Sequence, residues 1–138
     1  VINPIPLDKE REWFLDILNE IKKKNCIYLL AEYNGRVIGA CTIRRQKEET
    51  SRHVGVYDIV VEKEFWGLSI GETLTKHILA LAKNNLHLKI IRLILYSGNK
   101  PAEKLYRKFG FKVVGRIPKG VIHGRKYMDE IIFYKILK

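Results

Sequence analysis

Two short segments carry residue types and spacings that suit chemistry on an anionic ligand. Residues 58–72, DIVVEKEFWGLSIGE, run from a β-branched stretch through a glycine-punctuated turn into a helical pattern. Such a turn directs backbone N–H groups and the positive end of a helix dipole at one point, most often a phosphate site. Residues 99–111, NKPAEKLYRKFGF, place Asn99 and Tyr106 on a second turn and short helix. We therefore expect a larger ligand, with its anionic part at the first segment and its reactive end near the second.

The rest of the sequence predicts the elements that position these segments. Helical periodicity predicts helices over 9–24 and 71–85, and Pro101 with Gly110 brackets a short helix over 101–108. Asn34-Gly35 predicts a tight hairpin turn, and a polar loop is expected over 117–126. Strands are predicted at 27–33, 36–45, 52–61, 89–96, 111–116 and 127–137. The order predicts one α/β domain over residues 1–138, a single sheet with helices on its faces.

Charge and composition restrict the kind of partner. The net charge of +11 suits an acidic partner, such as nucleic acid, a membrane surface or a polyphosphate cofactor. The lysines are spread along the chain rather than packed into one run, which favours a solvated surface. Nucleic-acid binding is disfavoured because the sequence has no aromatic stacking strip and no helix-turn-helix pattern. No apolar run approaches the ~20 residues needed to span a bilayer, so no membrane partner is expected.

Cysteine and histidine usage points away from metal and disulfide chemistry. Cys26 and Cys41 fall on or beside adjacent predicted strands, which favours two buried free thiols in a reducing compartment, the cytoplasm. The four histidines, at positions 53, 77, 87 and 123, show no metal-ligand spacing, so no metal site is expected.

Taken together, these segments resemble the GNAT superfamily of acetyl-CoA-dependent N-acyltransferases, from about Ile27 to Leu137. In that family a strand ends in valine, and a motif rich in glycine then opens a helix. Here Val61 ends the strand and Gly71 fills the last motif position, while Ser69 replaces the middle glycine and Trp66 replaces an arginine or glutamine. The later family element is matched in full by Asn99, Ala102, Tyr106, Gly110 and Phe111.

The resemblance implies a mixed, mostly antiparallel central sheet with helices on both faces. The family's first strand and first helix are missing or curtailed before Ile5, so the sequence does not decide how the domain begins. The implied activity is transfer of an acetyl group from acetyl-CoA to a primary amine of a small molecule, a protein or a peptide. Homodimerisation is left open.

The resemblance also assigns residues to the cofactor. The strand residues would pair their backbone with the pantetheine arm, and Asn99 would hydrogen-bond that arm or simply cap the helix that follows it. The loop would cradle the pyrophosphate, where Ser69 carries a Cβ in place of a glycine. The implied cofactor residues are Ile59, Val60, Val61, Trp66, Gly67, Leu68, Ser69, Ile70, Gly71, Glu72, Asn99, Ala102 and Tyr106.

Two residues are candidates for catalysis. A leaving thiolate needs a proton or a hydrogen bond, and the phenol of Tyr106 could supply it; the alternative is a helix tyrosine packed on the sheet. An ammonium must lose a proton before it attacks, and Asp58 is the one carboxylate on the strand before the loop. It could be the base, or a carboxylate that orients the substrate or is only solvated. His53 could titrate but is expected at the exposed start of the strand.

The acceptor and the reaction class complete the set of expectations. Glu32, Asp129 and Glu130 could supply negative charge for a cationic amine. No cysteine falls near the expected thioester site, so direct attack in a ternary complex is favoured over an acyl-enzyme. The alternatives are a non-catalytic CoA-binding module that acts as a sensor or in an interaction and, less favoured, a basic nucleic-acid-binding domain.

Overall fold

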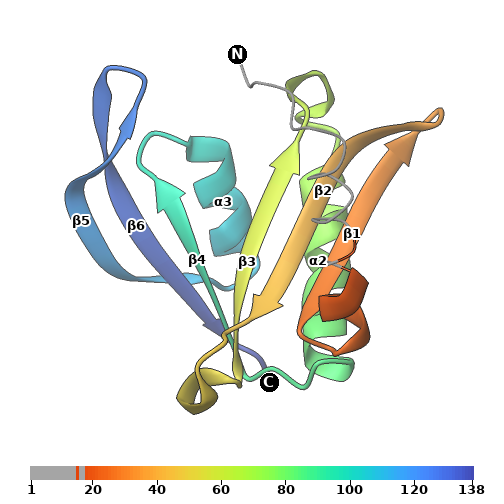
Figure 1. Cartoon of the computed structure of the whole chain (residues 1–138). Coiled ribbons are helices and arrows are strands. Elements are labelled where there is room, and N and C mark those ends of the chain that lie inside the picture. Colours follow the sequence, from red (N-terminus) through yellow and green to blue (C-terminus); the bar gives the residue numbers. More distant parts are fainter. Residues whose placement is uncertain (1–14, 16–17) are drawn as a thin grey trace.

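The computed structural model describes residue 15 and residues 18–138, and these form one mixed sheet with helices packed on it (Figure 1). Residues 15 and 18–22 are helical; the remainder of the helix predicted over 9–24 lies outside the described residues. The main helices are α2 (Ile70–Asn84) and α3 (Lys100–Lys108). The strands are β1 (Cys26–Tyr33), β2 (Arg36–Arg45), β3 (Val54–Val61), β4 (Ile90–Tyr96), β5 (Lys112–His123) and β6 (Lys126–Ile136).

The sheet is mostly antiparallel and opens in its middle. Its strand order is β1-β2-β3-β4-β6-β5, and β3 and β4 form its parallel pair. The two strands pair over three residues each, from Val54 opposite Ile90 to Val56 opposite Arg92. Beyond Val56, β3 stays paired with β2 up to Val61, and β4 stays paired with β6 up to Tyr96. The two strands therefore separate, and a gap bordered by backbone opens between them (Figure 1).

Gly55 allows the closed end of this pair to pack tightly. A Cβ atom at Gly55 would lie 2.7 Å from both Ile43 Cγ2 and Leu88 Cδ1, a distance that side chains do not adopt. Ile43, Leu88 and Ile91 are fully buried around it. The core thus clamps β3 to β4 at one end, and the separation begins immediately beyond the clamp.

α2 and α3 lie beside each other on one face of the sheet. Lys108 Nζ of α3 is 2.9 Å from Glu72 Oε1 of α2, and a Cβ at Gly71 would lie 3.4 Å from Leu105. Alternate residues of the central strands point to this face and form the core beneath the two helices. They include Cys41, Ile43, Tyr57, Ile91, Leu93, Leu95, Ile131 and Phe133.

The opposite face is more open in the described part of the chain. In Figure 1 the helical residues 18–22 pass in front of the sheet, whereas α2 lies behind it, so helices flank both faces. On β4, however, Ile94 and Tyr96 of the opposite face are each 47% exposed. The middle of the sheet therefore presents an accessible surface beside the gap.

The region 117–126, predicted as a loop, is instead mostly strand. β5 continues to His123, and a turn at Gly124 leads directly into β6. Gly120 falls in a bulge between Ile117 and Val121, where Lys119 has a φ of +56°. The Asp129 carboxylate accepts a hydrogen bond from Lys119 N–H at 3.0 Å and stabilises this bulge. The prediction was wrong because a contact from the neighbouring strand sets the local conformation.

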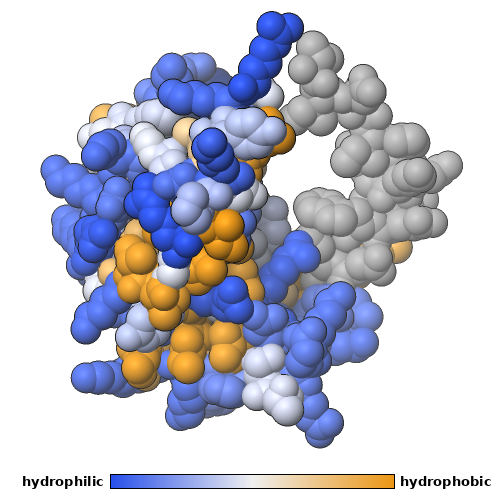
Figure 2. Space-filling view, turned by 90° about the vertical axis from the view of Figure 1, so that its left-hand side faces the viewer, coloured by the Kyte–Doolittle hydropathy of each residue, from blue (hydrophilic) through white to orange (hydrophobic). Residues whose placement is uncertain are grey.

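β5 is an edge strand with an apolar outer surface. Figure 2 looks onto this side of the molecule and shows apolar side chains among lysines and arginines. The exposed apolar residues of β5 are Val113, Val114, Ile117 and Ile122. Homodimerisation stays a prediction. Among the described helices, none is long and apolar enough to cross a membrane.

Candidate functional site

The turn between β3 and α2 has the geometry of an anion-binding loop. Gly67 has a φ of +81° and Ser69 a φ of +62°, and α2 begins at Ile70. The Ser69 side chain makes no capping hydrogen bond to the helix. The first N–H groups of α2 have no intrahelical acceptor, and they point out of the helix end together with its positive dipole. Residues 66–72, which the sequence assigned to pyrophosphate, thus form a loop that can hold an anion.

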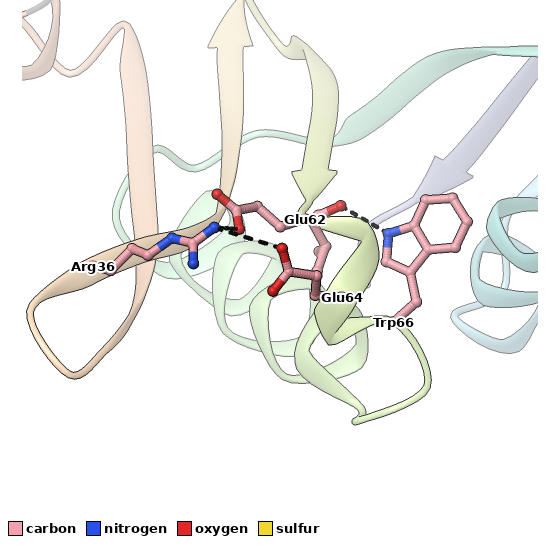
Figure 3. A network of polar contacts seen from close by, with 5 residues as sticks. Arg36, Glu62, Glu64 and Trp66 are labelled. Atoms are coloured by element: carbon pink, nitrogen blue, oxygen red, sulfur yellow. Dashed lines mark hydrogen bonds and ion pairs between the residues drawn. The ribbon is translucent and has the colours of Figure 1, made fainter.

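Polar contacts on the β2 side hold the chain that leads into this loop. Arg36, at the start of β2, is ion-paired with Glu62, and its Nη2 lies 4.0 Å from Glu64 Oε1 (Figure 3). On the other side of β3, Trp66 Nε1 donates a hydrogen bond to the Val61 carbonyl at 2.8 Å. The loop therefore leaves the strand at a fixed angle, with the indole on the side of β3 that faces away from β2 (Figure 3).

A buried polar network that sequence reasoning missed fixes the start of α2. Thr75 Oγ1 donates to the Gly71 carbonyl at 2.7 Å and is 2.7 Å from the Tyr57 hydroxyl. Thr75 is fully buried and Tyr57 is 3% exposed. The network ties the first turn of α2 to β3. A threonine four residues after the motif glycine, on the buried helical face, was the signal that could have revealed it.

The hydrogen-bonding pattern between β2 and β3 shows which backbone groups of β3 point into the gap. In an antiparallel pair, alternate residues bond to the partner and the others point away. Glu62 N–H donates to Ile38 O of β2, and His53 O accepts from Ile90 N–H of β4. The even-numbered residues of β3 therefore face β2, and the odd-numbered ones face β4 or the gap. In the separated stretch, Ile59 and Val61 direct their N–H and C=O groups into the gap, whereas those of Val60 face β2.

Tyr106 of α3 packs on the helical face against Tyr57, the first residue of β3 beyond the paired stretch. Its ring is 6% exposed and packs among Tyr57, Phe111 and Phe133, with centroid distances of 5.9–6.2 Å. Burial, with a further contribution from the negative charge of Asp58, raises the pKa of Tyr106 to about 12. The phenol is therefore protonated at neutral pH and is a hydrogen-bond donor.

Asp58 lies on β3 with its side chain on the opposite face of the sheet from Tyr57. It is exposed, and its Oδ1 accepts a hydrogen bond from Ile59 N–H at 3.0 Å. Asp58 and Tyr106 thus approach the gap from opposite faces. His53 precedes β3 at the closed end of the pair, away from the gap.

The three carboxylates predicted to bind substrate do not lie together. Glu130 is half-buried on β6, opposite Tyr96, and shares the face of Asp58. Asp129 points the other way; its carboxylate accepts from Arg116 Nε at 2.7 Å and from Lys119 N–H, and these bonds lower its pKa. Glu32 lies two strands from β3 and four residues along from the register of Asp58, roughly 10 Å across and 13 Å along the sheet.

The remaining cofactor candidates have structural roles of their own. Asn99 Oδ1 accepts from Ala102 N–H at 3.2 Å and so caps α3, which leaves its amide NH₂ without a partner among the described residues. Glu72 pairs with Lys108 rather than facing the loop. A Cβ at Gly71 would lie 3.4 Å from Leu105 and 3.9 Å from Ile59, at ordinary contact distances, so the packing of α2 against α3 does not require a glycine there.

Both cysteines are free and buried, as predicted. Cys41 Sγ lies 3.9 Å from the Leu74 carbonyl in the core, and burial raises the pKa of its thiol to about 12. A protonated, enclosed thiol is a poor nucleophile, which agrees with direct attack on a thioester rather than an acyl-enzyme.

Comparison with known proteins identifies the family of the chain. The family model for the acetyltransferase (GNAT) family matches residues 3–111. The chain belongs to the GNAT family. It is an N-acetyltransferase domain whose acetyl donor, in this family, is acetyl-CoA.

Individual members of the GNAT family agree with this assignment. L-amino acid N-acetyltransferase AaaT of Escherichia coli (strain K12) is 29% identical over 108 residues, 78% of this chain and 67% of that protein. A Bacillus subtilis (strain 168) protein with the provisional name ribosomal protein bS18-alanine N-acetyltransferase is 31% identical over 88 residues, 64% of this chain and 55% of that protein. The chain thus spans between half and about two thirds of these relatives.

A solved structure confirms the fold. The crystal structure of a GNAT-family acetyltransferase from Streptococcus pneumoniae superposes with a TM-score of 0.84 at 27% identity, covering 90% of this chain and 74% of that one. The predicted fold class, a mixed and mostly antiparallel GNAT sheet, is therefore confirmed.

Proposed function

We propose that this domain binds acetyl-CoA along the open edge of β3 and transfers its acetyl group to the primary amine of an amino acid or of a peptide N-terminus. The observation that carries the proposal is the gap between β3 and β4. It exposes strand backbone beside an anion-binding loop, which suits a ligand with an amide-bearing arm and a pyrophosphate. The N-acetyltransferases it resembles are named for amino-acid and protein-alanine acceptors.

The residues around the gap support a direct transfer. The amine nitrogen forms a bond to the thioester carbonyl carbon and loses its second proton to solvent. The C–S bond breaks, and the departing thiolate takes up a proton from solvent to give free CoA. Asp58 is placed to accept the proton that the ammonium must lose. Tyr106, with its pKa raised to about 12, is placed to donate a hydrogen bond to the developing thiolate. Because that pKa lies above the ordinary thiol value near 8.5, the phenol stabilises the thiolate more readily than it protonates it.

The acceptor would approach from the face opposite α2 and α3. On this face Asp58 and Glu130 provide negative charge near the gap, while Ile94 and Tyr96 provide an exposed apolar and aromatic surface. An open surface of this kind admits a peptide as well as a free amino acid. Glu32 and Asp129 contribute less in this arrangement, because one lies far from Asp58 and the other is engaged by Arg116 and Lys119.

The acceptor class can be determined by release of free CoA thiol from acetyl-CoA with a panel of amines. We expect turnover with amino acids or peptides that carry a free α-amine, and none with their N-acetylated forms. Titrating CoA by calorimetry in parallel separates two outcomes. Binding without turnover on any amine would support a non-catalytic CoA-binding module, and absence of binding would contradict the cofactor site itself.

Ser69 provides a specific test of the anion loop. A Ser69→Glu change places a carboxylate where the pyrophosphate is proposed to lie, and we expect CoA affinity to fall at least tenfold by charge repulsion. Ser69→Gly restores the residue type that suits a positive φ and is expected to retain or improve binding. Thr73→Glu, one turn further along α2, is the matched control for added charge. Equal CoA dissociation constants for Ser69→Glu and wild type would exclude this loop as the pyrophosphate-binding site.

A further inference from the structure

The open edge of β3 is already hydrogen-bonded to its own chain at two points. Trp66 Nε1 donates to the Val61 carbonyl at 2.8 Å, and Asp58 Oδ1 accepts from the Ile59 N–H at 3.0 Å. Both bonds involve odd-numbered residues of β3, whose backbone groups face the gap. Trp66 lies on that side of the strand, away from Arg36 and β2 (Figure 3). We define these two bonds as the edge caps.

The edge caps occupy half of the groups that the proposed ligand would use. Ile59 and Val61 together direct two N–H donors and two C=O acceptors into the gap. A pantetheine arm has two amides, and so offers two donors and two acceptors in return. With the caps in place, the Ile59 N–H is fully used, because it has a single hydrogen to donate. The Val61 carbonyl keeps a second lone pair, but the Trp66 indole occupies the gap side of the strand from which a ligand N–H would approach it (Figure 3). Full pairing therefore requires that Asp58 releases Ile59 and that the indole moves away from Val61, because a buried amide left unpaired is unfavourable.

We propose that Trp66 and Asp58 close the edge of β3 in the cofactor-free chain, and that the pantetheine arm binds by replacing both edge caps. This inference rests on the proposed acetyl-CoA site. Trp66 is a positioning residue in this scheme, because it acts through the Val61 carbonyl. Displacement also has a consequence for the reaction. Once the pantetheine carbonyl takes the Ile59 N–H, both oxygens of Asp58 are free to accept the amine's proton.

Matched variants separate the caps from other effects of the same residues. Trp66→Phe keeps an aromatic ring but removes the Nε1 donor. Asp58→Ala removes the acceptor, whereas Asp58→Asn removes the charge and retains an oxygen that can accept from Ile59 N–H. Glu62→Gln is the control for lost charge on the same segment, because Glu62 pairs with Arg36 on the β2 side.

The test is calorimetric titration of the full chain with CoA and, separately, with ADP, which has a pyrophosphate but no pantetheine arm. We expect Trp66→Phe and Asp58→Ala each to tighten CoA binding about fivefold, the effect of one net hydrogen bond no longer broken on binding. Asp58→Asn and Glu62→Gln should bind CoA as wild type does. ADP affinity should be the same in all five proteins.

The outcomes distinguish this inference from the proposed function. Unchanged or weaker CoA binding in both Trp66→Phe and Asp58→Ala, with wild-type circular dichroism and Tm, would overturn the displacement of the caps while leaving the cofactor site standing. Failure of the wild-type chain to bind CoA would overturn the cofactor site. A purely structural role for the caps predicts a lower Tm and weaker binding of both ligands, and it would also contradict the inference.

An optical readout follows the Trp66 cap directly. The chain has two tryptophans, so a Trp13→Phe background leaves Trp66 as the single emitter. Addition of CoA should shift the emission of Trp66 as the indole leaves the Val61 carbonyl, whereas ADP should not. Identical spectra with saturating CoA and with ADP would mean that the indole stays in place, against the proposal.

Discussion

Tyr106→Phe is expected to lower kcat about 100-fold while acetyl-CoA affinity stays near the wild-type value. Phenylalanine keeps the ring in its contacts with Tyr57, Phe111 and Phe133, so the local packing is retained. What is lost is the phenol that is proposed to donate to the leaving thiolate. Steady-state release of free thiol, together with calorimetric CoA binding, measures the two quantities separately.

Tyr57→Phe is the matched control, since this second buried tyrosine has its hydroxyl engaged with Thr75. We expect Tyr57→Phe to lower the free energy of unfolding by about 1 kcal/mol through the lost hydrogen bond and to leave kcat nearly unchanged. A Tyr106→Phe enzyme with kcat close to wild type would remove Tyr106 from the mechanism. With its pKa raised to about 12, the phenol of Tyr106 should cause no loss of activity between neutral and moderately alkaline pH.

Asp58→Asn is expected to lower kcat/KM by about 100-fold near neutral pH and by much less in alkaline solution. At pH 7 an α-amine with a pKa near 8 is only about one tenth free base, so the reaction depends on a group that removes the proton. As pH rises above the pKa of the amine, the substrate arrives already deprotonated and the need for Asp58 disappears. The variant should therefore gain activity with pH more steeply than wild type does.

Glu130→Gln separates deprotonation from simple attraction of a cation. Glu130 shares the face of Asp58 but lies on β6, across β4. We expect it to raise KM for a cationic amine without altering the shape of the pH profile. Parallel pH–rate profiles for Asp58→Asn and wild type would leave Asp58 without a role as base, and deprotonation through water would then account better for the reaction.

The turns and helix starts predicted on the cofactor side came from local patterns, and the structure has these turns and helix starts. The positive φ values at Gly67 and Ser69 and the start of α2 at Ile70 follow from residues adjacent in sequence. The same holds for Asn99, which caps α3 through Ala102, and for the Asn34-Gly35 hairpin turn. In such segments the glycines, caps and short-range hydrogen bonds determine the conformation, so a single sequence contains nearly all of the information.

The acceptor side depended on contacts between residues far apart in the chain. Asp129 and Glu130 are neighbours in sequence, yet strand alternation turns them to opposite faces, and Arg116 and Lys119 engage only Asp129. The bulge of β5 forms where the polar stretch with Gly120 predicted a loop, because the Asp129 carboxylate on β6 stabilises it. Neither the engagement of Asp129 nor the bulge of β5 can be predicted from the residues adjacent in sequence.

The sequence by itself determined the family, the anion loop and the candidacy of Tyr106 and Asp58. Only the tertiary structure decided that β3 and β4 separate beyond Val56, that Tyr106 and Asp58 reach the gap from opposite faces, and that Trp66 and Asp58 cap its edge. The physical reason is that the pairing of β3 with β4 depends on contacts between residues far apart in the chain, such as the packing of Ile43 and Leu88 around Gly55. Which backbone groups then face the gap follows from the hydrogen-bond register of β3 with β2.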